Sequence, residues 1–287
     1  MEMNINHVVP RVGLGTYNMS SQEAEDISYA AIKYGYRHID TAAVYRNEDG
    51  VGKALKRIFT ETDLKRNDIT ISIKLWPGGL IKLDRVKNKE GTMKSLEKSL
   101  RNLDLEYVDL YLIHSPHAQK KRIEQWETLL TLQENGKAKN IGVSNWGINH
   151  LQELEEKGLP LPSANQIELH PWSQKPELVS YLKDKGIDII AYSSLVPLST
   201  WRHKDGENSL KTDEMYQDGN DSNSLYKKLA AKYNVTEAQV LLKWALQLGY
   251  AVLPKSIRED RMKENYNLDF TIHEEDMDLI KQFGQQY

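Results

Sequence analysis

Four residues whose side chains commonly move protons stand at or near the ends of strand-like segments. Asp40 follows the segment YRHI, Lys74 follows ITISI, and His114 follows DLYLI. Tyr45 lies a few residues beyond Asp40. Because α/β barrels assemble their active sites at the carboxyl ends of separate strands, this recurrence predicts that the four side chains lie together.

A tyrosine beside a lysine has the chemistry of a general acid. A free phenol has a pKa of about 10, and a neighbouring ammonium group lowers that pKa by favouring the phenolate. Asp40 would keep Lys74 charged and oriented, so that Tyr45 could protonate an alkoxide as it forms. His114 could hydrogen-bond a carbonyl oxygen. Taken singly, each residue also fits a structural role, such as Asp40 capping a helix, but the combination favours proton transfer.

Composition excludes several classes of protein. The chain has 287 residues, a net charge of −3 and no cysteine, with 39% hydrophobic and 28% charged residues. Disulfides, thiolate nucleophiles and Cys-based zinc sites are therefore excluded, and no strong field attracts nucleic acid or an anionic membrane. The N-terminal residues lack a signal-peptide core, and no apolar run approaches the roughly 20 residues that span a bilayer. We expect a soluble cytoplasmic protein, a monomer or weak dimer without a metal.

Short apolar segments alternate with longer amphipathic ones along the whole chain. The predicted strands are Arg11–Gly15, Arg37–Asp40, Ile69–Lys74, Val108–His114, Asn140–Ser144, Ala164–Glu168, Asp188–Ser193 and Ala251–Pro254. The predicted helices are Ser21–Lys33, Gly50–Thr60, Lys89–Leu103, Ile123–Asn135, Ile148–Lys157, Pro176–Lys185, Ser222–Tyr233 and Glu237–Leu248. Strict alternation predicts parallel βαβ units, and eight units in a chain of this size predict a single (β/α)8 TIM barrel spanning residues 1–287. The polar, turn-rich stretch from Val196 to Asn223 is expected to be a long loop, either a solvated excursion or a lid over the site.

Two further groups of residues follow predicted strands. Lys255, Ser256, Arg258 and Arg261 place cations and a hydroxyl after the eighth strand, where barrels often bind phosphate at the start of a short helix. A solvated basic helix start is the alternative. Ser144, Asn145 and Gln166 follow the fifth and sixth strands, where they could hydrogen-bond an amide, and Tyr192 could stack on a flat heterocycle or pack at the barrel rim. The segment GLGTYN lacks the third glycine of a Rossmann fingerprint, so we do not interpret it as one.

Taken together, these segments closely resemble the aldo-keto reductase superfamily. The matching stretches run in the family's order over nearly the whole chain and read GYRHIDTAAVYRNEDGVGKAL, YVDLYLIHSP, GKAKNIGVSNW, NQIELHPW, IIAYSSL and LPKSIREDRMKEN. The resemblance implies a (β/α)8 barrel that binds NADPH in an extended form without a Rossmann domain. It implies an NADPH-dependent carbonyl reductase, with Tyr45 as the proton donor, Lys74 as the modulator of its pKa, Asp40 as the partner of Lys74, and His114 orienting the carbonyl.

The resemblance also implies where cofactor and substrate lie. The expected cofactor contacts are Gly15, Thr16, Tyr17, Asp40, Ser144, Asn145, Gln166, Tyr192, Ser193, Leu195, Pro254, Lys255, Ser256, Arg258, Arg261, Glu264 and Asn265. Within that set, Ser144, Asn145 and Gln166 would hold the carboxamide, and Lys255, Ser256 and Arg261 the 2′-phosphate. The expected substrate contacts are Tyr17, Tyr45, Trp76, His114, Trp146 and, at the pocket rim, Trp172.

Some positions depart from the usual pattern of the family. Arg258 stands where many relatives carry Thr or Asn, which implies an extra cation for the phosphate. Ser115 stands where a pocket-lining tryptophan often lies. The chain ends soon after its last helix, which implies a more open pocket. Segments HSPH and AYSSLVPL are similar to those of microbial members that reduce keto esters, diketones and related small carbonyls. Alternatives are a regulatory NADPH-binding subunit of low turnover and a Schiff-base aldolase using Lys74.

Overall fold

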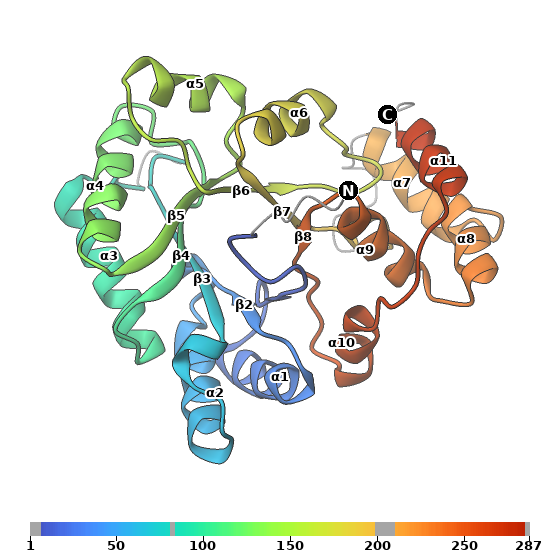
Figure 1. Cartoon of the computed structure of the whole chain (residues 1–287), viewed down its shortest axis with the longest axis horizontal. Helices are drawn as coiled ribbons and strands as arrows, with labels where there is room; N and C mark the ends of the chain where they lie inside the picture. Colours follow the sequence, from blue (N-terminus) through green and yellow to red (C-terminus); the bar gives the residue numbers. More distant parts are fainter. Residues whose placement is uncertain (1–6, 81–83, 199–209, 285–287) are drawn as a thin grey trace.

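The computed structural model describes residues 7–80, 84–198 and 210–284, and it forms a closed ring of parallel strands surrounded by helices (Figure 1). The strands follow one another in chain order, each parallel to the next. Their bounds are β1 (Leu14–Gly15), β2 (His38–Asp40), β3 (Thr70–Leu75), β4 (Val108–Ile113), β5 (Ala138–Ser144), β6 (Ala164–Glu168), β7 (Asp188–Tyr192) and β8 (Ala251–Val252). The predicted (β/α)8 barrel is confirmed.

Backbone hydrogen bonds close the ring between its first and last strands. Val12 bridges Val252 in parallel, Gly13 N donates to Val252 O at 2.9 Å, and Val252 N donates to Arg11 O at 2.8 Å. The observed strands β1 and β8 are shorter than the predicted Arg11–Gly15 and Ala251–Pro254, because only two residues of each pair regularly with a neighbouring strand. A closed ring has no exposed edge.

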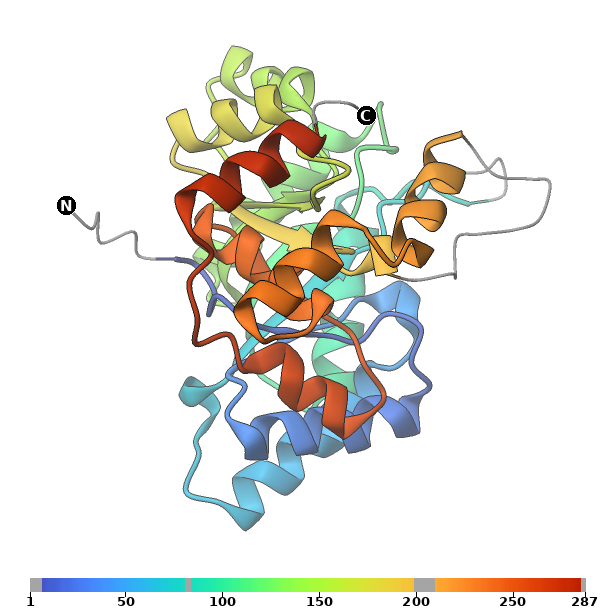
Figure 2. The ribbon, with the colours of Figure 1, turned by 90° about the vertical axis from the view of Figure 1, so that its right-hand side faces the viewer.

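Helices cover the outer face of the ring. Eight of the described helices match, in chain order, the predicted ones: α1 (Ser21–Tyr34), α2 (Glu48–Glu61), α3 (Lys89–Leu103), α4 (Arg122–Glu134), α5 (Ile148–Glu156), α6 (Pro176–Asp184), α8 (Leu225–Tyr233) and α9 (Glu237–Gln247). Three more are α7 (Leu210–Asn220), α10 (Glu259–Tyr266) and α11 (Glu274–Gly284), and 3-10 turns lie at η1 (Ala43–Tyr45), η2 (Arg66–Asp68) and η3 (Val196–Leu198). Figure 2 shows α8, α9, α10 and α11 covering one side of the barrel.

The prediction of a long loop after β7 is wrong in part. The stretch from Val196 to Asn223 contains η3 and the helix α7. Its composition hid the helix, because α7 has the sequence LKTDEMYQDGN, in which Asp, Gly and Asn are more typical of turns. Residues 199–209 lie outside the described residues, so the predicted lid is not tested there.

Strand periodicity divides the apolar residues between two layers. In β4, Leu110 and Leu112 join the inner cluster inside the barrel, whereas Tyr111 and Ile113 join the larger cluster between strands and helices. The same alternation applies to β3, where Ile71 and Ile73 belong to the outer cluster. The polar residues that alternate with these isoleucines, Ser72 and Lys74, therefore face the inside of the barrel.

The first two helices pack so closely that one position must be glycine. A Cβ atom added at Gly50 in α2 would lie 2.0 Å from Ser21 O in α1. Backbone atoms cannot move aside as the end of a flexible side chain can. This contact sets how near α2 comes to α1, and α2 begins just after Tyr45.

We predict that Gly50→Ala lowers the free energy of unfolding by about 1–3 kcal/mol, because the methyl group overpacks this contact. Gly91→Ala in α3 is the matched control, since its Cβ would meet only side-chain atoms of Asn88 and Lys87, none closer than 3.3 Å. Urea unfolding followed by circular dichroism measures both variants. Equal stabilities in the two variants would contradict the packing argument.

Candidate active site

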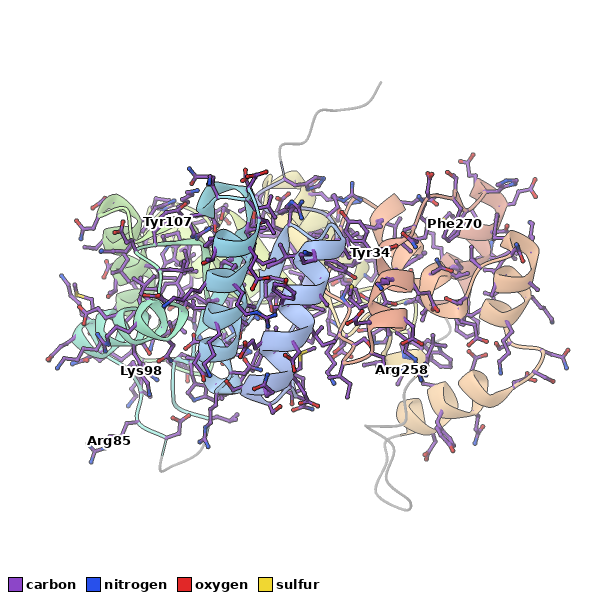
Figure 3. The ribbon with its side chains drawn as sticks, turned by 90° about the horizontal axis from the view of Figure 1, so that it is seen from below. Tyr34, Arg85, Lys98, Tyr107, Arg258 and Phe270 are labelled. Carbon is purple, nitrogen blue, oxygen red and sulfur yellow. The ribbon has the colours of Figure 1, made fainter. Side chains whose placement is uncertain are left out.

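The barrel brings the four proton-moving residues to one end. Asp40 is the last residue of β2, Lys74 lies next to the end of β3, His114 follows β4 directly, and Tyr45 ends η1. Figure 3 shows the barrel from the side, with Arg85 after β3 and Arg258 after β8 toward one end and Tyr107, before β4, toward the other. The predicted convergence at the carboxyl ends of the strands follows from parallel pairing.

A buried ion pair joins Asp40 and Lys74. Lys74 Nζ donates to Asp40 Oδ1 and, at 3.1 Å, to Thr41 O. The Lys74 side chain has no exposed surface and that of Asp40 only 4%. Burial acts to lower the pKa of Lys74, but the Asp40 carboxylate and the Tyr45 phenol outweigh it, so the pKa is raised. The lysine is therefore held in its charged form.

Two further donors reach the other oxygen of Asp40. Ser72 Oγ donates to Asp40 Oδ2 at 2.7 Å, and Gln166 Nε2 donates to the same atom at 2.9 Å. A buried carboxylate needs such bonds because its lost hydration is otherwise uncompensated. The bond from Gln166 also links the acid-base group to the amide group at the ends of β5 and β6.

Tyr45 lies against the ammonium group of Lys74, whose Nζ is 5.1 Å from the centre of the phenol ring. Burial raises the pKa of Tyr45, Lys74 opposes that shift through its charge and a hydrogen bond, and Asp40 adds to it. The net direction is upward, so the expected lowering by Lys74 is outweighed. Burial could not be judged from the sequence. The phenol is consequently protonated at neutral pH, which is the state that a proton donor requires.

The imidazole of His114 is neutral. Burial, together with the charge of Lys74, lowers the pKa of His114 to about 3, and Asp40 opposes this only weakly. Its backbone is fixed by His114 N donating to Leu75 O at 2.9 Å and by Asn145 Nδ2 donating to His114 O at 3.1 Å. A neutral, fixed imidazole can donate one hydrogen bond to a carbonyl oxygen without adding a charge.

Four aromatic rings gather around these groups. Tyr17 contacts Tyr45 edge to face at 5.1 Å, Tyr45 contacts His114 at 5.8 Å, and Trp76 contacts His114 at 5.7 Å. Trp76 Nε1 donates to Asp84 Oδ2 at 2.8 Å, which holds the indole in place. Tyr17 remains 48% exposed. These rings form an apolar rim suited to a small substrate, and all four are expected substrate contacts.

The two other tryptophans expected at the pocket, Trp146 and Trp172, lie elsewhere. Trp146 is fully buried in the hydrophobic core, with Arg122 over its ring at 5.7 Å and His150 at its edge. Trp172 packs with Val196 and Phe283 in a separate cluster. The structure does not bring either ring to the aromatic rim, so their role as substrate contacts stays a prediction that this packing disfavours.

Residues expected to hold an amide do converge. Ser144 Oγ donates to Gln166 O at 2.8 Å, Asn145 Nδ2 donates to Ser144 Oγ at 3.1 Å, and Tyr192 OH donates to Asn145 Oδ1 at 2.7 Å. Asn145 has a φ of 63°, and Asn accepts this left-handed conformation more readily than most residues. Ser193 turns in the same way, at φ 56°.

The expected phosphate-binding residues cluster at the start of α10. Ser256 Oγ accepts from Arg258 N at 3.0 Å and is nearly buried, whereas Lys255, Arg258 and Arg261 are exposed. Arg258 forms an ion pair with Asp260, and neither Lys255 nor Arg261 has an ion pair with a described residue. The first turn of α10 has no side-chain cap.

The other expected cofactor contacts lie around the same opening or behind it. Gly15 N donates to Pro254 O at 3.1 Å, and Thr16 Oγ1 donates to Asp40 O at 3.0 Å. Leu195 packs on the core, Asn265 is buried, and Glu264 accepts from Thr236. Sequence reasoning missed His38, Ser72, Asn47 and Asp84, which hold these groups in place. Asn47 lies within the segment GYRHIDTAAVYRNEDGVGKAL, and its place in that family motif was the available sign of a role at the site.

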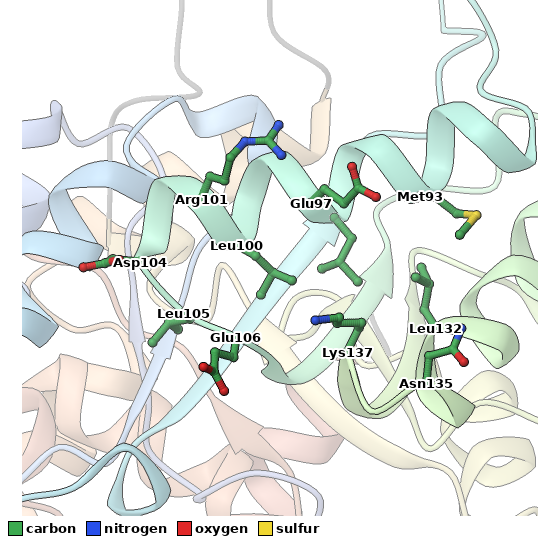
Figure 4. A pocket seen from close by; sticks show the side chains of 11 residues that line it. Met93, Glu97, Leu100, Arg101, Asp104, Leu105, Glu106, Leu132, Asn135 and Lys137 are labelled. Atoms are coloured by element: carbon green, nitrogen blue, oxygen red, sulfur yellow. The ribbon is translucent and has the colours of Figure 1, made fainter.

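A separate hollow of about 800 Å³ lies between α3 and the C-terminal end of α4 (Figure 4). Leu96, Leu100 and Leu132 form its apolar floor, and charged side chains form its rim. None of the four proton-moving residues lines it, so we assign it no part in the chemistry. Within the described residues, no cluster of metal-ligating side chains is found. No described helix is long and apolar enough to cross a membrane.

Comparisons with known proteins agree with this geometry. Residues 11–285 match the model of the Aldo/keto reductase family. The chain belongs to this family. It is 38% identical over 274 residues to the glyoxal reductase of Bacillus subtilis, covering 95% of this chain and 88% of the relative. It is 34% identical to glycerol 2-dehydrogenase (NADP(+)) of Saccharomyces cerevisiae, covering 100% and 91%.

Among solved structures, the aldo-keto reductase of Bombyx mori in complex with NADP has a TM-score of 0.84 and 29% identity, covering 100% of this chain and 93% of that one. The barrel of this chain is therefore an aldo/keto reductase barrel. Membership makes the chain an oxidoreductase of the carbonyl-reducing type, and the resemblance stated from the motifs is confirmed.

The neutral state of His114 has a consequence for stability. Its pKa of about 3 lies below the value of about 6.5 in an unfolded chain, so the unfolded state binds more protons as the pH falls. Between pH 7 and pH 5 this one residue should remove about 2 kcal/mol of stability.

We predict that His114→Asn lessens the decline in the free energy of unfolding between pH 7 and pH 5 by about that amount, because asparagine does not titrate. Urea unfolding of the wild type and the variant at both pH values measures the difference. Equal pH dependence in both proteins would show that His114 titrates normally.

Proposed function

We propose that this aldo/keto reductase reduces small aldehydes and ketones with NADPH and uses Tyr45 as the general acid. One observation carries the proposal, namely the buried pair of Asp40 and Lys74 set directly beside the Tyr45 phenol. A charged lysine in an apolar interior is costly and persists only with a partner. Its position beside a protonated phenol gives it a role in proton transfer.

The residues at the inner end of the opening fit a nicotinamide. Ser144, Asn145 and Gln166 offer hydroxyl and amide groups at adjacent strand ends, within reach of a carboxamide. Tyr192 stands beside them at the end of β7, where its ring can stack on a flat heterocycle. Hydrogen bonds that these side chains make to one another keep them in place.

The residues at the outer end fit a 2′-phosphate. Lys255, Arg258 and Arg261 carry positive charges around the uncapped first turn of α10, where backbone N–H groups point outward. To bind a phosphate, Arg258 would have to break its ion pair with Asp260 or bind both groups at once. Arg261 has no competing ion pair with a described residue. Arginine suits phosphate because its planar group makes two parallel hydrogen bonds. An NADP relative and an NADP-bound neighbour support the same cofactor.

The chain's own residues account for the proton. A bound nicotinamide supplies the hydride that the protein itself cannot provide. His114 holds the carbonyl oxygen with one hydrogen bond, and Tyr45 donates its hydroxyl proton to that oxygen as negative charge develops there. Lys74 stabilises the phenolate that remains, and Asp40 keeps the lysine in position. The aromatic rim excludes water and strengthens each of these interactions.

The raised pKa of Lys74 argues against the aldolase alternative. A Schiff-base lysine must be neutral to attack a carbonyl, which requires a lowered pKa. Lys74 is instead held charged and donates to Asp40 and to Thr41 O. The regulatory-subunit alternative has no observation in its favour.

The substrate is a small carbonyl compound. The aromatic rim admits an apolar or planar group. Ser115 is buried, and its hydroxyl hydrogen-bonds His117 Nδ1 at 2.7 Å, so the contacts of Ser115 do not place its side chain on this rim. The glyoxal reductase relative supports dicarbonyls among the substrates, in line with the diketones and keto esters expected from the motifs.

We predict that Tyr45→Phe lowers kcat with an aldehyde substrate by at least about 100-fold, because the proton donor is removed while the ring is kept. NADPH binding, measured by fluorescence titration, should be retained. Tyr34→Phe is the control, since Tyr34 bonds Asn267 on the outer surface. A Tyr45→Phe variant with the rate of the control would disprove the acid role.

We predict that Arg261→Ala raises the KM for NADPH about 10-fold and leaves that for NADH unchanged, because one charge-assisted phosphate contact is lost. Lys263→Ala on the same helix is the control, since Lys263 pairs with Glu259. Steady-state kinetics with both cofactors measures the ratio. An equal effect on NADPH and NADH would place Arg261 away from the phosphate.

A further inference from the structure

Two polar side chains face the barrel interior next to the Asp40–Lys74 pair and have no part in the mechanism above. His38 lies two residues before Asp40 in β2, and Ser72 lies two residues before Lys74 in β3. Side chains two apart on a strand share a face, so His38 and Ser72 point inward with the ion pair. Both have no exposed surface.

His38, Ser72 and Asp40 form one hydrogen-bonded relay. His38 Nε2 lies 2.8 Å from Ser72 Oγ, and Ser72 Oγ lies 2.7 Å from Asp40 Oδ2. The register of β2 and β3 sets Asp40 directly opposite Ser72, which makes the contact a property of the sheet. Lys74 takes one carboxylate oxygen, and Ser72 and Gln166 take the other.

Proton counting fixes the direction of the relay. A serine hydroxyl carries one hydrogen, and an ionised carboxylate can only accept. The bond to the carboxylate is charge-assisted and therefore the stronger, so the Ser72 hydrogen lies toward Asp40. Ser72 then offers a lone pair to His38, whose Nε2 must carry the hydrogen. Nδ1 of the same ring makes no hydrogen bond with a described residue, so no acceptor there holds a hydrogen on Nδ1.

The ring of His38 is neutral at pH 7. Burial lowers its pKa to about 4, assisted by the charge of Lys74 and opposed by Asp40 and by the carbonyl of Pro10. That carbonyl makes no hydrogen bond with Nδ1. It defines the rival arrangement, in which Nδ1 carries the hydrogen and Ser72 turns away from Asp40.

We propose that His38 and Ser72 are positioning residues: His38 orients the Ser72 hydroxyl, and Ser72 fixes one oxygen of Asp40 so that the other remains directed at Lys74. The proposal rests on the proposed function, because the lysine so placed is the one beside the Tyr45 acid. Without the Ser72 hydroxyl, a buried oxygen would lose one of its donors and the carboxylate could rotate. A shift of about 1 Å in a catalytic group can reduce a rate about 100-fold.

A matched pair of variants tests the role of the hydroxyl. The valine of Ser72→Val and the threonine of Ser72→Thr have the same shape, and only threonine keeps the hydroxyl donor. We expect Ser72→Val to lower kcat by about 10-fold or more, with the KM for the carbonyl within about twofold and a larger solvent deuterium isotope effect, because proton transfer is slowed. Ser72→Thr should retain the wild-type values. Equal kcat and isotope effects in the two variants overturn the proposal.

A second pair repeats the comparison at His38. His38→Gln can present an N–H near the place of Nε2, and His38→Met has similar length without a donor. The glutamine variant should keep more activity than the methionine variant. This pair carries the same test if Ser72→Val fails to fold, and equal rates in both variants overturn the role of His38.

Nitrogen NMR of histidine-labelled protein tests the relay without turnover. The His38 signal is assigned as the one that His38→Gln removes. We expect the Nε2–H tautomer, with the Nε2 proton shifted in Ser72→Val and unshifted in Ser72→Thr. An Nδ1–H tautomer overturns the relay even in an active enzyme. Absence of carbonyl reduction by the wild type would instead overturn the proposed function, so the two failures are distinct.

Discussion

The site depends on one buried ion pair, between Asp40 and Lys74. Neither group would remain charged in the barrel interior alone, and breaking such a pair by removing one partner costs about 3–5 kcal/mol. The pair persists because neighbouring polar groups compensate both charges: Ser72 and Gln166 donate to the carboxylate, and the Thr41 carbonyl accepts from the ammonium group. In the proposed mechanism, the positive charge that results allows the Tyr45 phenol to release its proton and remain as a stabilised phenolate.

The closed barrel supplies the precision that this pair needs. Parallel pairing with fixed register sets β2 against β3 and β3 against β4. Lys74 therefore lies two residues past the partner of Asp40, and His114 lies two residues past the partner of Lys74. Gln166 then ties Asp40 to the amide group at the ends of β5 and β6. In the proposed function, cofactor binding and proton transfer therefore share one hydrogen-bonded framework.

Sequence periodicity predicted most of the fold and the meeting of the four proton-moving residues, because strand ends in a parallel barrel lie at one end. It did not reveal α7, whose composition is that of a turn. It could not show that burial outweighs Lys74 in setting the pKa of Tyr45, because burial depends on packing across the chain. The positions of Trp146 and Ser72 could not be predicted for the same reason. The neighbouring sequence does not show whether an aromatic residue after a strand packs into the core. Nor does it show whether a serine in a strand lies opposite a carboxylate on the next strand.

A double-mutant cycle tests the dependence on the ion pair most directly. Asp40→Asn, Lys74→Met and the combined variant would be compared by single-turnover carbonyl reduction with saturating NADPH, and by urea unfolding. If the two side chains act as a unit, the combined variant should lose little more activity than the worse single variant and should be more stable than Asp40→Asn, which leaves the lysine charge unpaired. Losses in rate that simply multiply, with no coupling in stability, would contradict the account.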